Sequence, residues 1–359
     1  MKKVTLKLSH EKNIEIVDSL IVDNTGNEAT KKKLFEVKCY IDNLDGKKWE
    51  LSKKKENIYE YIYTSSKKNR NICDIVPVSR SYFKIHEIIK IFNIYDKNLS
   101  CACIAEGPGG FIHCLNDNNS SRIYGITLLC KDNKKVPFWN QLIISNKNNK
   151  LSNGSDNTGD IYHIDNVNYF IKEIGEDLCN LITADGGFDY SNDYNSQENM
   201  SYKLLYCEIF TALNIQKVGG NFVIKFFDLF NINTMKLIYI LYNCYNTIEI
   251  YKPSTSRLSN SEKYIICKGL IDIPIKIINI MKEYYENPEK ILINIPKSFI
   301  DEITHYNQRF AEKQVQIINT IITNINKNNI EKPTKEQIVV AKRWCELYGL
   351  PLNKTCIFL

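Results

Sequence analysis

The sequence has few turn-forming residues and none of the long apolar runs that mark a membrane span. It holds only 15 glycines and 9 prolines in 359 residues. No stretch approaches the ~18 to 20 consecutive apolar residues of a transmembrane helix. The N-terminus alternates charged and apolar residues and lacks the apolar centre of a signal peptide. We therefore expect a globular protein of the cytoplasm or nucleus that does not associate with a membrane.

Histidine is also scarce, and the cysteines are not arranged as metal ligands. There are 5 histidines, and the 12 cysteines are scattered without a repeated pair at zinc-finger spacing. Most of the cysteines lie within apolar runs, which is typical of buried, reduced residues in an intracellular protein. The sequence thus predicts no metal site.

The balance of charge is mildly basic. Lysine and arginine outnumber aspartate and glutamate by 47 to 41, which gives a net charge of +6. Each basic cluster alone is typical of a solvated face, but together they favour a nucleic-acid partner. The clusters are Lys31 to Lys33, Lys53 to Lys55, Lys67 and Lys68 with Arg70, and Lys134 with Lys135.

Three regions differ in their pattern. Residues 1–70 combine alternating segments such as "LFEVKCYI" (34–41) with lysine-rich connections, which predicts an N-terminal extension with short strands. Residues 71–270 alternate apolar strand-like runs with segments of helical period, which predicts an α/β domain with a mostly parallel sheet. Residues 271–359 read as a helical C-terminal extension. Within the middle region, the Asn, Ser and Gly-rich segment 145–159 is expected to be a loop.

Three of the few glycines are concentrated in "CACIAEGPGGFIHCL" (101–115). The apolar run predicts a strand, and Gly107-Pro108-Gly109-Gly110 would then turn the chain into a helix that begins near Phe111. Ligands bind at the carboxyl ends of parallel strands, where glycines allow the backbone to approach and helix N-termini offer N–H groups. A phosphate loop is excluded because no Gly-Lys-Ser/Thr follows. A tight connection with no ligand is the alternative.

Four charged residues stand near predicted strand or helix ends. Lys225 lies inside the apolar run "NFVIKFF", where an ammonium group must be paired or must face a cleft. Lys84 begins a helix in "SRSYFKIHEI", Asp185 ends a strand in "LITADGGFD", and Glu262 precedes the strand "KYIIC". An edge strand that turns Lys225 to water is the alternative for that segment.

In order and spacing, "SRSYFK", "ADGGFD", "GGNFVIKFF" and "SRLSNSEKYIIC" resemble the motifs of the FtsJ-like family of S-adenosylmethionine-dependent RNA 2′-O-ribose methyltransferases. The resemblance covers about residues 75–270. It implies a Rossmann-like fold with a seven-stranded sheet and one antiparallel strand. It also implies that Lys84, Asp185, Lys225 and Glu262 form a catalytic tetrad around the ribose hydroxyl.

The resemblance implies a binding site for S-adenosyl-L-methionine as well. "AEGPGGFI" looks like the family's cofactor turn, with Gly109, Gly110 and Phe111 beside the methionine half of the cofactor. Asp160 matches the position that contacts the adenine edge, with Asp165 as a rival that we expect to cap a helix. Bacterial members carry an acidic residue where this chain has Thr127. The cofactor-binding residues expected on this basis are Glu106, Gly107, Pro108, Gly109, Gly110, Phe111, Thr127, Asp160 and Asp185.

The segments "GITLL" and "EGPGGF" look most like the cap-specific members from eukaryotes and large DNA viruses. The implied activity is that of an mRNA cap-specific nucleoside-2′-O-methyltransferase acting on the first transcribed nucleotide, in the cytoplasm, a viral factory or virion, or the nucleus. Its expected partners are the capped mRNA 5′ end and a capping or polymerase subunit. A ribosomal or transfer RNA substrate is one alternative, and a non-catalytic RNA-binding scaffold is another.

The residues expected to contact RNA flank these motifs. Phe138 and Trp139 could form a pocket that stacks on a methylated guanine, or they could anchor their loop in the core. Arg80 and Arg257 could bind phosphates or form salt bridges. The full set of expected RNA contacts is Arg80, Lys131, Lys134, Lys135, Phe138, Trp139 and Arg257.

Overall fold

Seven strands form the central sheet, in the order β4-β3-β2-β5-β6-β8-β7. β8 runs antiparallel to both of its neighbours, and the other pairs are parallel. The computed structural model describes residues 14–17, 26–130, 133, 136–188, 193–325 and 332–359. The strands are β2 (Ser100–Ile104), β3 (Arg122–Ile126), β4 (Asn149–Ser152), β5 (Cys179–Ala184), β6 (Gln216–Phe226), β7 (Tyr245–Tyr251) and β8 (Lys263–Leu270). The predicted Rossmann-like α/β class, with one antiparallel strand, is confirmed.

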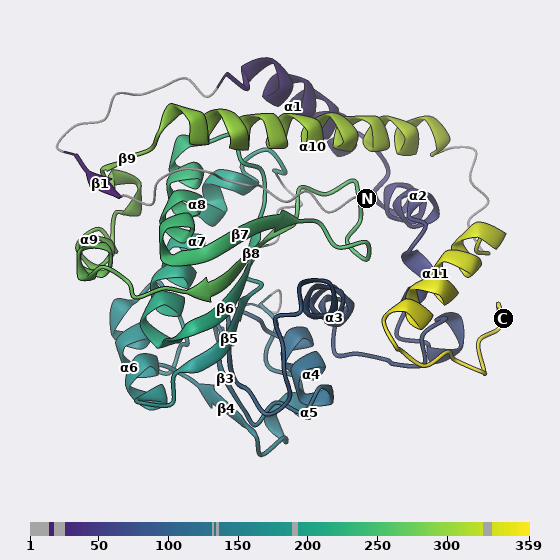
Figure 1. The fold of residues 1–359 in the computed structure, drawn as a ribbon. Coiled ribbons are helices and arrows are strands. Elements are labelled where there is room, and N and C mark those ends of the chain that lie inside the picture. Colours follow the sequence, from purple (N-terminus) through teal and green to yellow (C-terminus); the bar gives the residue numbers. More distant parts are fainter. Residues whose placement is uncertain (1–13, 18–25, 131–132, 134–135, 189–192, 326–331) are drawn as a thin grey trace.

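The central strands are mostly apolar because helices cover both faces of the sheet (Figure 1). All five residues of β2 are buried, and alternate residues of this strand belong to two different hydrophobic clusters. One cluster includes residues of α6 (Ile164–Ile174), α7 (Gln197–Ile215) and α8 (Ile232–Cys244). The other includes residues of α3 (Ser81–Phe92), α4 (Gly110–Asp117) and α5 (Gln141–Ile144).

The two terminal extensions meet each other on the surface of this α/β unit. In Figure 1, α1 lies beside the long helix α10, and α11 lies near α2. A third hydrophobic cluster joins α1, α2 and α10, and it includes Leu34, Trp49 and Ile318. The extensions contain α1 (Glu28–Asp42), α2 (Gly46–Glu56), α9 (Ile275–Glu283), α10 (Lys297–Asn324) and α11 (Lys335–Leu347), the short 3-10 turns Glu60–Ile62, Lys68–Arg70 and Pro288–Lys290, and the paired strands β1 (Glu15–Ile16) and β9 (Ile293–Asn294).

Two local predictions were wrong. Residues 34–41, expected to be a strand, lie in helix α1, because Leu34 and Lys38 are four residues apart and both face inward from that helix. The segment 145–159, expected to be a loop, contains β4, which pairs with β3 at the sheet edge. In both segments, contacts with another part of the fold determine the secondary structure: α1 packs against α10, and β4 pairs with β3.

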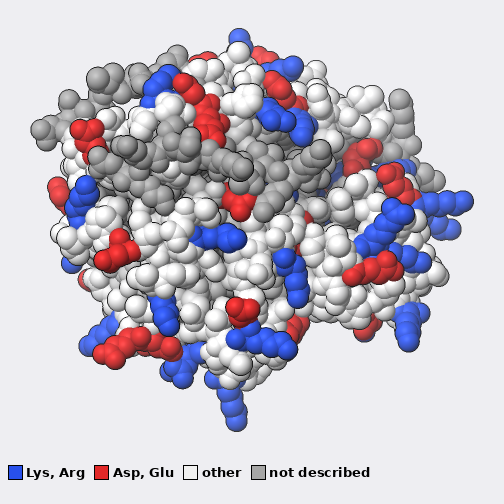
Figure 2. All heavy atoms as spheres, in the orientation of Figure 1, with Lys and Arg blue, Asp and Glu red and all other residues white. Residues whose placement is uncertain are grey.

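The surface shown in Figure 2 carries basic and acidic side chains interspersed with each other. All twelve cysteines fall in the described part of the chain, where they are free thiols and ten of them are buried, in agreement with the sequence prediction. Among the described helices, none combines the length and the apolar character that crossing a bilayer requires.

Candidate active site

The four predicted catalytic residues come together because three strand ends and one helix start meet at the same edge of the sheet. Asp185 directly follows β5, and Lys225 is the penultimate residue of the adjacent strand β6. Since β8 is antiparallel to β6, Glu262, just before β8, lies at the same edge. Lys84 reaches this edge from the first turn of α3.

Lys225 is held against Asp185. Its ammonium group lies 2.6 Å from the Asp185 carbonyl oxygen and 3.2 Å from Oδ1 of the same residue. The hydroxyl group of Tyr264 donates a hydrogen bond of 2.8 Å to the same Oδ1. Because Tyr264 is fully buried and stands opposite Lys225 in the β6–β8 register, it fixes the carboxylate beside the lysine.

Lys84 and Glu262 form the second ion pair. Lys84 Nζ lies 2.7 Å from Glu262 Oε2, and the hydroxyl group of Ser256 donates to Oε1 at 2.7 Å. Both carboxylate oxygens therefore have a fixed donor. A charged pair with little access to water is strongly oriented when its remaining hydrogen-bonding capacity is filled in this way.

The site is electrostatically coupled. Burial on its own lowers the pKa of Lys225, but the Asp185 and Glu262 carboxylates more than offset this and raise that pKa above its usual value. Burial likewise raises the pKa of Glu262, while the ammonium groups of Lys84, Lys225 and Lys252 lower it to about 2. At neutral pH the site therefore holds ammonium groups facing carboxylates, and Lys225 is a cation.

The Glu262 carboxylate should stabilise the fold in a pH-dependent manner. Its folded-state pKa of about 2 lies below the usual value of 4.5, so its contribution is present above the unfolded-state pKa and is lost as the pH falls toward 2. We expect the unfolding free energy of the wild type, relative to Glu262→Gln, to be constant above about pH 5 and to fall by up to about 3 kcal/mol toward pH 2. Urea unfolding at several pH values measures this difference, and a difference that grows on acidification would contradict the assignment.

A polar pocket of about 370 Å³ opens over the tetrad. Asp185, Lys225 and Glu262 line it, and Ser79, Ser81 and Asn260 lie on its walls. Ser79 and Ser81 pack against Gly110. A Cβ atom at position 110 would lie 2.1 Å from each of their hydroxyl oxygens, so only glycine leaves room for these two side chains. The glycine turn therefore packs against the wall of the tetrad pocket.

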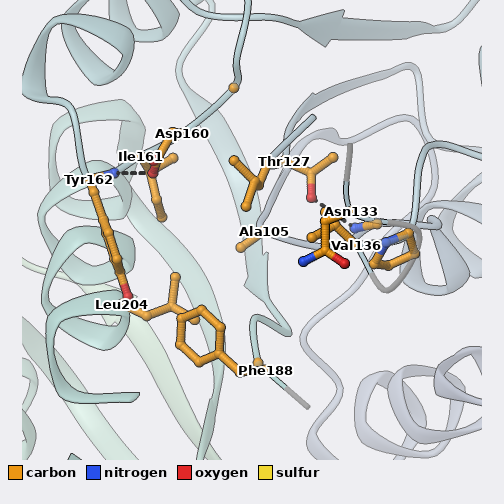
Figure 3. Close-up of a pocket in the computed structure, with 14 residues that line it drawn as sticks. Ala105, Thr127, Asn133, Val136, Asp160, Ile161, Tyr162, Phe188 and Leu204 are labelled. Atoms are coloured by element: carbon orange, nitrogen blue, oxygen red, sulfur yellow. Dashed lines mark hydrogen bonds between the residues drawn. The ribbon is translucent and has the colours of Figure 1, made fainter. Parts of the chain in front are cut away.

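A second cavity, of about 380 Å³, lies next to the first (Figure 3). Asp160 and Tyr162 stand on one side of it, with Asn133 and Val136 opposite and Phe188 and Leu204 beyond. The wall is mainly apolar, with a few convergent polar groups, as is usual for a cofactor site of this size. The two cavities share Ala105, Gly107, Gly187 and Phe188, so a molecule in the second can present a reactive atom to the tetrad.

The glycine turn contributes to these cavities less widely than the sequence analysis predicted. Gly107 lines both cavities, but Glu106 and Asp185 line the tetrad pocket instead of the apolar cavity. Phe111 is 1% exposed and its ring centroid lies 6.1 Å from that of Tyr264, so its side chain packs in the core, and its contact with the cofactor stays a prediction. Among the described pocket-lining residues, Pro108, Gly109, Gly110 and Phe111 do not appear. Their role is to turn the chain from β2 into α4.

Thr127 and Asp160, two of the expected cofactor-binding residues, lie in the wall of the apolar cavity. Both line the apolar cavity, and the Thr127 hydroxyl accepts a hydrogen bond from the Gly107 N–H at 3.1 Å. The Tyr162 N–H donates to Asp160 Oδ1 at 2.9 Å, which orients the carboxylate. The rival Asp165 is exposed in the first turn of α6, whose N-cap is His163, so its expected capping position is off by two residues.

The two arginines expected to bind phosphate form ion pairs within the protein. Arg257 donates to both carboxylate oxygens of Glu60 at 3.0 and 3.2 Å, and Arg80 lies 3.4 Å from the same carboxylate. Arg80 also donates to the carbonyl oxygens of Tyr63 and Thr255. The alternative of a salt bridge is what the structure shows, and these contacts join the N-terminal extension to the tetrad segments.

The proposed aromatic pair is divided between core and surface. Trp139 is 7% exposed and belongs to the hydrophobic cluster of α3 and α4, whereas Phe138 is 45% exposed. Trp139 therefore anchors its loop in the core while the Phe138 ring is exposed, and a contact of either ring with RNA stays a prediction. Lys131, Lys134 and Lys135 lie outside the described residues.

Several residues that shape the site were not predicted. Gly187 and Phe188 lie two and three residues after Asp185, so the position of Asp185 at a strand end was a usable signal for them. Ser79 and Asn260 likewise lie within the motifs of Lys84 and Glu262. Tyr264 also lies within the motif of Glu262, two residues after it. Leu204 on α7 carried no signal, because only the packing of distant elements brings it to the site.

A parallel sheet with one reversed strand, a cofactor-sized cavity at the strand ends and an adjoining lysine–carboxylate cluster define an α/β methyltransferase. The family model described as FtsJ-like methyltransferase matches residues 77–270, which is more than half of the chain, and the chain belongs to this family. S-adenosylmethionine is the methyl donor of the family.

Curated relatives match beyond the family region. "Cap-specific mRNA (nucleoside-2'-O-)-methyltransferase 1" from Mus musculus is 26% identical over 362 residues, covering 90% of this chain and 42% of that protein. The protein of the same name from Homo sapiens is 25% identical over 352 residues, with the same coverage. Its counterpart in Caenorhabditis elegans is 31% identical over 240 residues, covering 59% of this chain and 26% of that protein. The chain thus spans less than half the length of these relatives.

The residues of the apolar cavity fit the methyl donor. Ile161, Phe188 and Leu204 can enclose an adenine ring, while the Asp160 carboxylate can accept hydrogen bonds from a nucleoside. At the junction of the two cavities, a Cβ on Gly107 would lie 2.5 Å from the Pro137 carbonyl oxygen, so only glycine leaves the passage its present shape. The passage leads to Lys225 and Asp185.

Proposed function

We propose that the chain methylates the ribose 2′-hydroxyl of RNA, and that its substrate is the first transcribed nucleotide of capped mRNA. The observation that carries the proposal is a pocket that Asp185, Lys225 and Glu262 line and that shares four residues with the cofactor-sized cavity. Lys84 does not line this pocket and joins the tetrad through its ion pair with Glu262. The name of the relatives, cap-specific mRNA methyltransferases, supports the choice of substrate.

Lys225 is the residue that would act on the ribose oxygen. S-adenosylmethionine, when bound, supplies a methyl group on a positively charged sulfur. The transfer is a displacement at carbon, so the oxygen must be aligned with that carbon and carry negative charge as it attacks. The Lys225 ammonium group favours ionisation of a nearby hydroxyl and stabilises the oxyanion. Because the pKa of Lys225 is raised, we assign it an orienting, cationic role instead of that of a neutral base.

The other three residues keep this cation in place. Asp185 holds Lys225 through two contacts, and Tyr264 fixes the Asp185 carboxylate in turn. Glu262 balances the charges of Lys84 and Lys225, which would otherwise repel each other. An RNA-binding scaffold would not need such a cluster, whose burial costs desolvation free energy.

Short capped and uncapped RNAs of the same sequence, offered with methyl-labelled S-adenosylmethionine, test the substrate. We expect the 2′-oxygen of the first nucleotide of capped RNA to be labelled at least about a hundredfold faster than that of uncapped RNA, because the cap supplies binding energy that orients the ribose. Nuclease digestion with mass spectrometry identifies the methylated position.

Two other results would each lead to a different function. Equal labelling of capped and uncapped RNA would replace the cap-specific proposal with a cap-independent enzyme acting on ribosomal or transfer RNA. No labelling of either RNA, together with normal RNA binding, would instead support the scaffold.

A further inference from the structure

Helix α1 of the N-terminal extension places one lysine beside the active-site segments. Lys38 Nζ lies 2.7 Å from Asp228 Oδ2 and 3.0 Å from the hydroxyl oxygen of Ser261. The Ser261 hydroxyl in turn donates to Asp228 Oδ2 at 3.0 Å. All three side chains are buried. They form a closed group that we call the Lys38 cluster: Lys38, Asp228 and Ser261.

This cluster connects two parts of the tetrad that are distant in the chain. Asp228 lies three residues after Lys225, in the segment that leaves β6. Ser261 directly precedes Glu262. A single side chain from α1 therefore ties together the segments that carry the tetrad's central lysine and one of its acids.

We propose that Lys38 is a positioning residue for methyl transfer, holding the Lys225 and Glu262 segments at their working separation through Asp228 and Ser261. The inference rests on the proposed function, since it concerns the same tetrad. Lys38 does not line the tetrad pocket, so it acts through its two partners. The N-terminal extension then contributes to the chemistry itself.

The energetics of the cluster favour positioning over stability. Burial on its own raises the pKa of Asp228, but the Lys38 and Lys263 ammonium groups bring it below its usual value, so the pair is ionic. Asp228 Oδ1 has no hydrogen-bond partner among the described residues. A buried ion pair with an unsatisfied oxygen adds little net stability compared with apolar residues of the same size. Its directional contacts do fix geometry, and a misplacement of about 1 Å at a catalytic group can cost about a hundredfold in rate.

The last four residues of the loop before β8 are each held by a hydrogen bond from another segment. Gln314 of α10 donates to the Ser259 carbonyl oxygen at 3.0 Å, and Lys252 donates to the side-chain oxygen of Asn260 at 2.7 Å. Lys38 holds Ser261, and Lys84 holds Glu262. Four consecutive residues are thus fixed by side chains of three helices and of Lys252, which directly follows β7, and the two terminal extensions supply two of the four contacts.

The test compares Lys38→Met with Glu36→Gln, which removes an exposed charge from the same helix. For Lys38→Met we expect the single-turnover rate of transfer to capped RNA to fall by about tenfold to a hundredfold. The dissociation constant of S-adenosylhomocysteine should stay within about twofold of wild type, because the cofactor cavity does not include the cluster. Glu36→Gln should leave both unchanged. A wild-type rate in Lys38→Met would overturn the inference.

Two further measurements separate positioning from loss of fold and from failure of the proposed function. Ser261→Ala keeps the ion pair and removes only the hydroxyl bridge, so it should fold and lose about threefold to tenfold in rate; an unchanged rate would count against the cluster. Hydrogen exchange over residues 258–263 needs no activity. It should quicken in Lys38→Met and not in Glu36→Gln, and equal exchange in both would refute the positioning role even if wild type transferred no methyl group.

Discussion

Lys225→Met abolishes methyl transfer while cofactor binding persists. The variant keeps most of the volume of the side chain but removes the charge that lies 2.6 Å from the Asp185 carbonyl oxygen and 3.2 Å from its carboxylate. Without the ammonium group, nothing at this position favours the ionised ribose hydroxyl. We expect the single-turnover rate to fall at least about a thousandfold, as when a key oxyanion-stabilising group is lost. Methyl-label incorporation into capped RNA measures it.

The matched control is Lys217→Met, at the exposed start of the same strand β6. It removes an equal charge and should leave the transfer rate unchanged. Calorimetric titration of S-adenosylhomocysteine should give a similar dissociation constant for wild type and for both variants. An active Lys225→Met would remove the chemical basis of the proposal, and a Lys225→Met that no longer bound the cofactor would show that the residue serves the cavity instead.

Gly159→Ala closes the cofactor cavity. Gly159 has φ of +62°, in the left-handed region that favours glycine, and a Cβ atom there would lie 2.0 Å from the Thr127 carbonyl oxygen. Both residues line the cavity, and the clash is with backbone, so a rotamer change cannot relieve it. We expect the affinity for S-adenosylhomocysteine to fall at least about tenfold and the unfolding free energy to fall by about 2 kcal/mol.

Gly219→Ala is the control that separates backbone strain from the collision of the new Cβ atom as causes of the lost affinity. Gly219 also has a left-handed φ, +80°, but nothing lies within 4 Å of its Cβ position. The control therefore carries the backbone strain without the collision and lies outside both cavities. It should lose some stability and keep cofactor affinity. Equal losses of affinity in the two variants would mean that the cavity at Gly159 is not the cofactor site.

The fold and the tetrad could be predicted from the sequence because their signals are local. Most strands of the sheet contain a short apolar run, with the polar edge strand β4 as the exception, and each tetrad residue stands within a few residues of a strand or helix end. Parallel strands bring such ends to one edge of the sheet, so order along the chain was enough to place Asp185 and Lys225 together.

The rest of the site depends on contacts between distant segments. Lys38 looked like one polar member of an alternating strand, whereas in α1 it reaches Asp228, 190 residues away. Arg80 and Arg257 looked like phosphate ligands because the buried Glu60 that binds both of them lies outside the motifs. A single sequence carries no signal for which side chains will pair when they lie this far apart along the chain.

The central claim is that the Lys225 ammonium group meets the ribose oxygen. A crystal structure of the chain with S-adenosylhomocysteine and a short capped RNA measures this directly. The account predicts that the 2′-oxygen of the first transcribed nucleotide lies about 3 Å from Lys225 Nζ, with the cofactor sulfur in the cavity lined by Thr127 and Asp160. A ribose held elsewhere, with Lys225 bound only to Asp185, would contradict it.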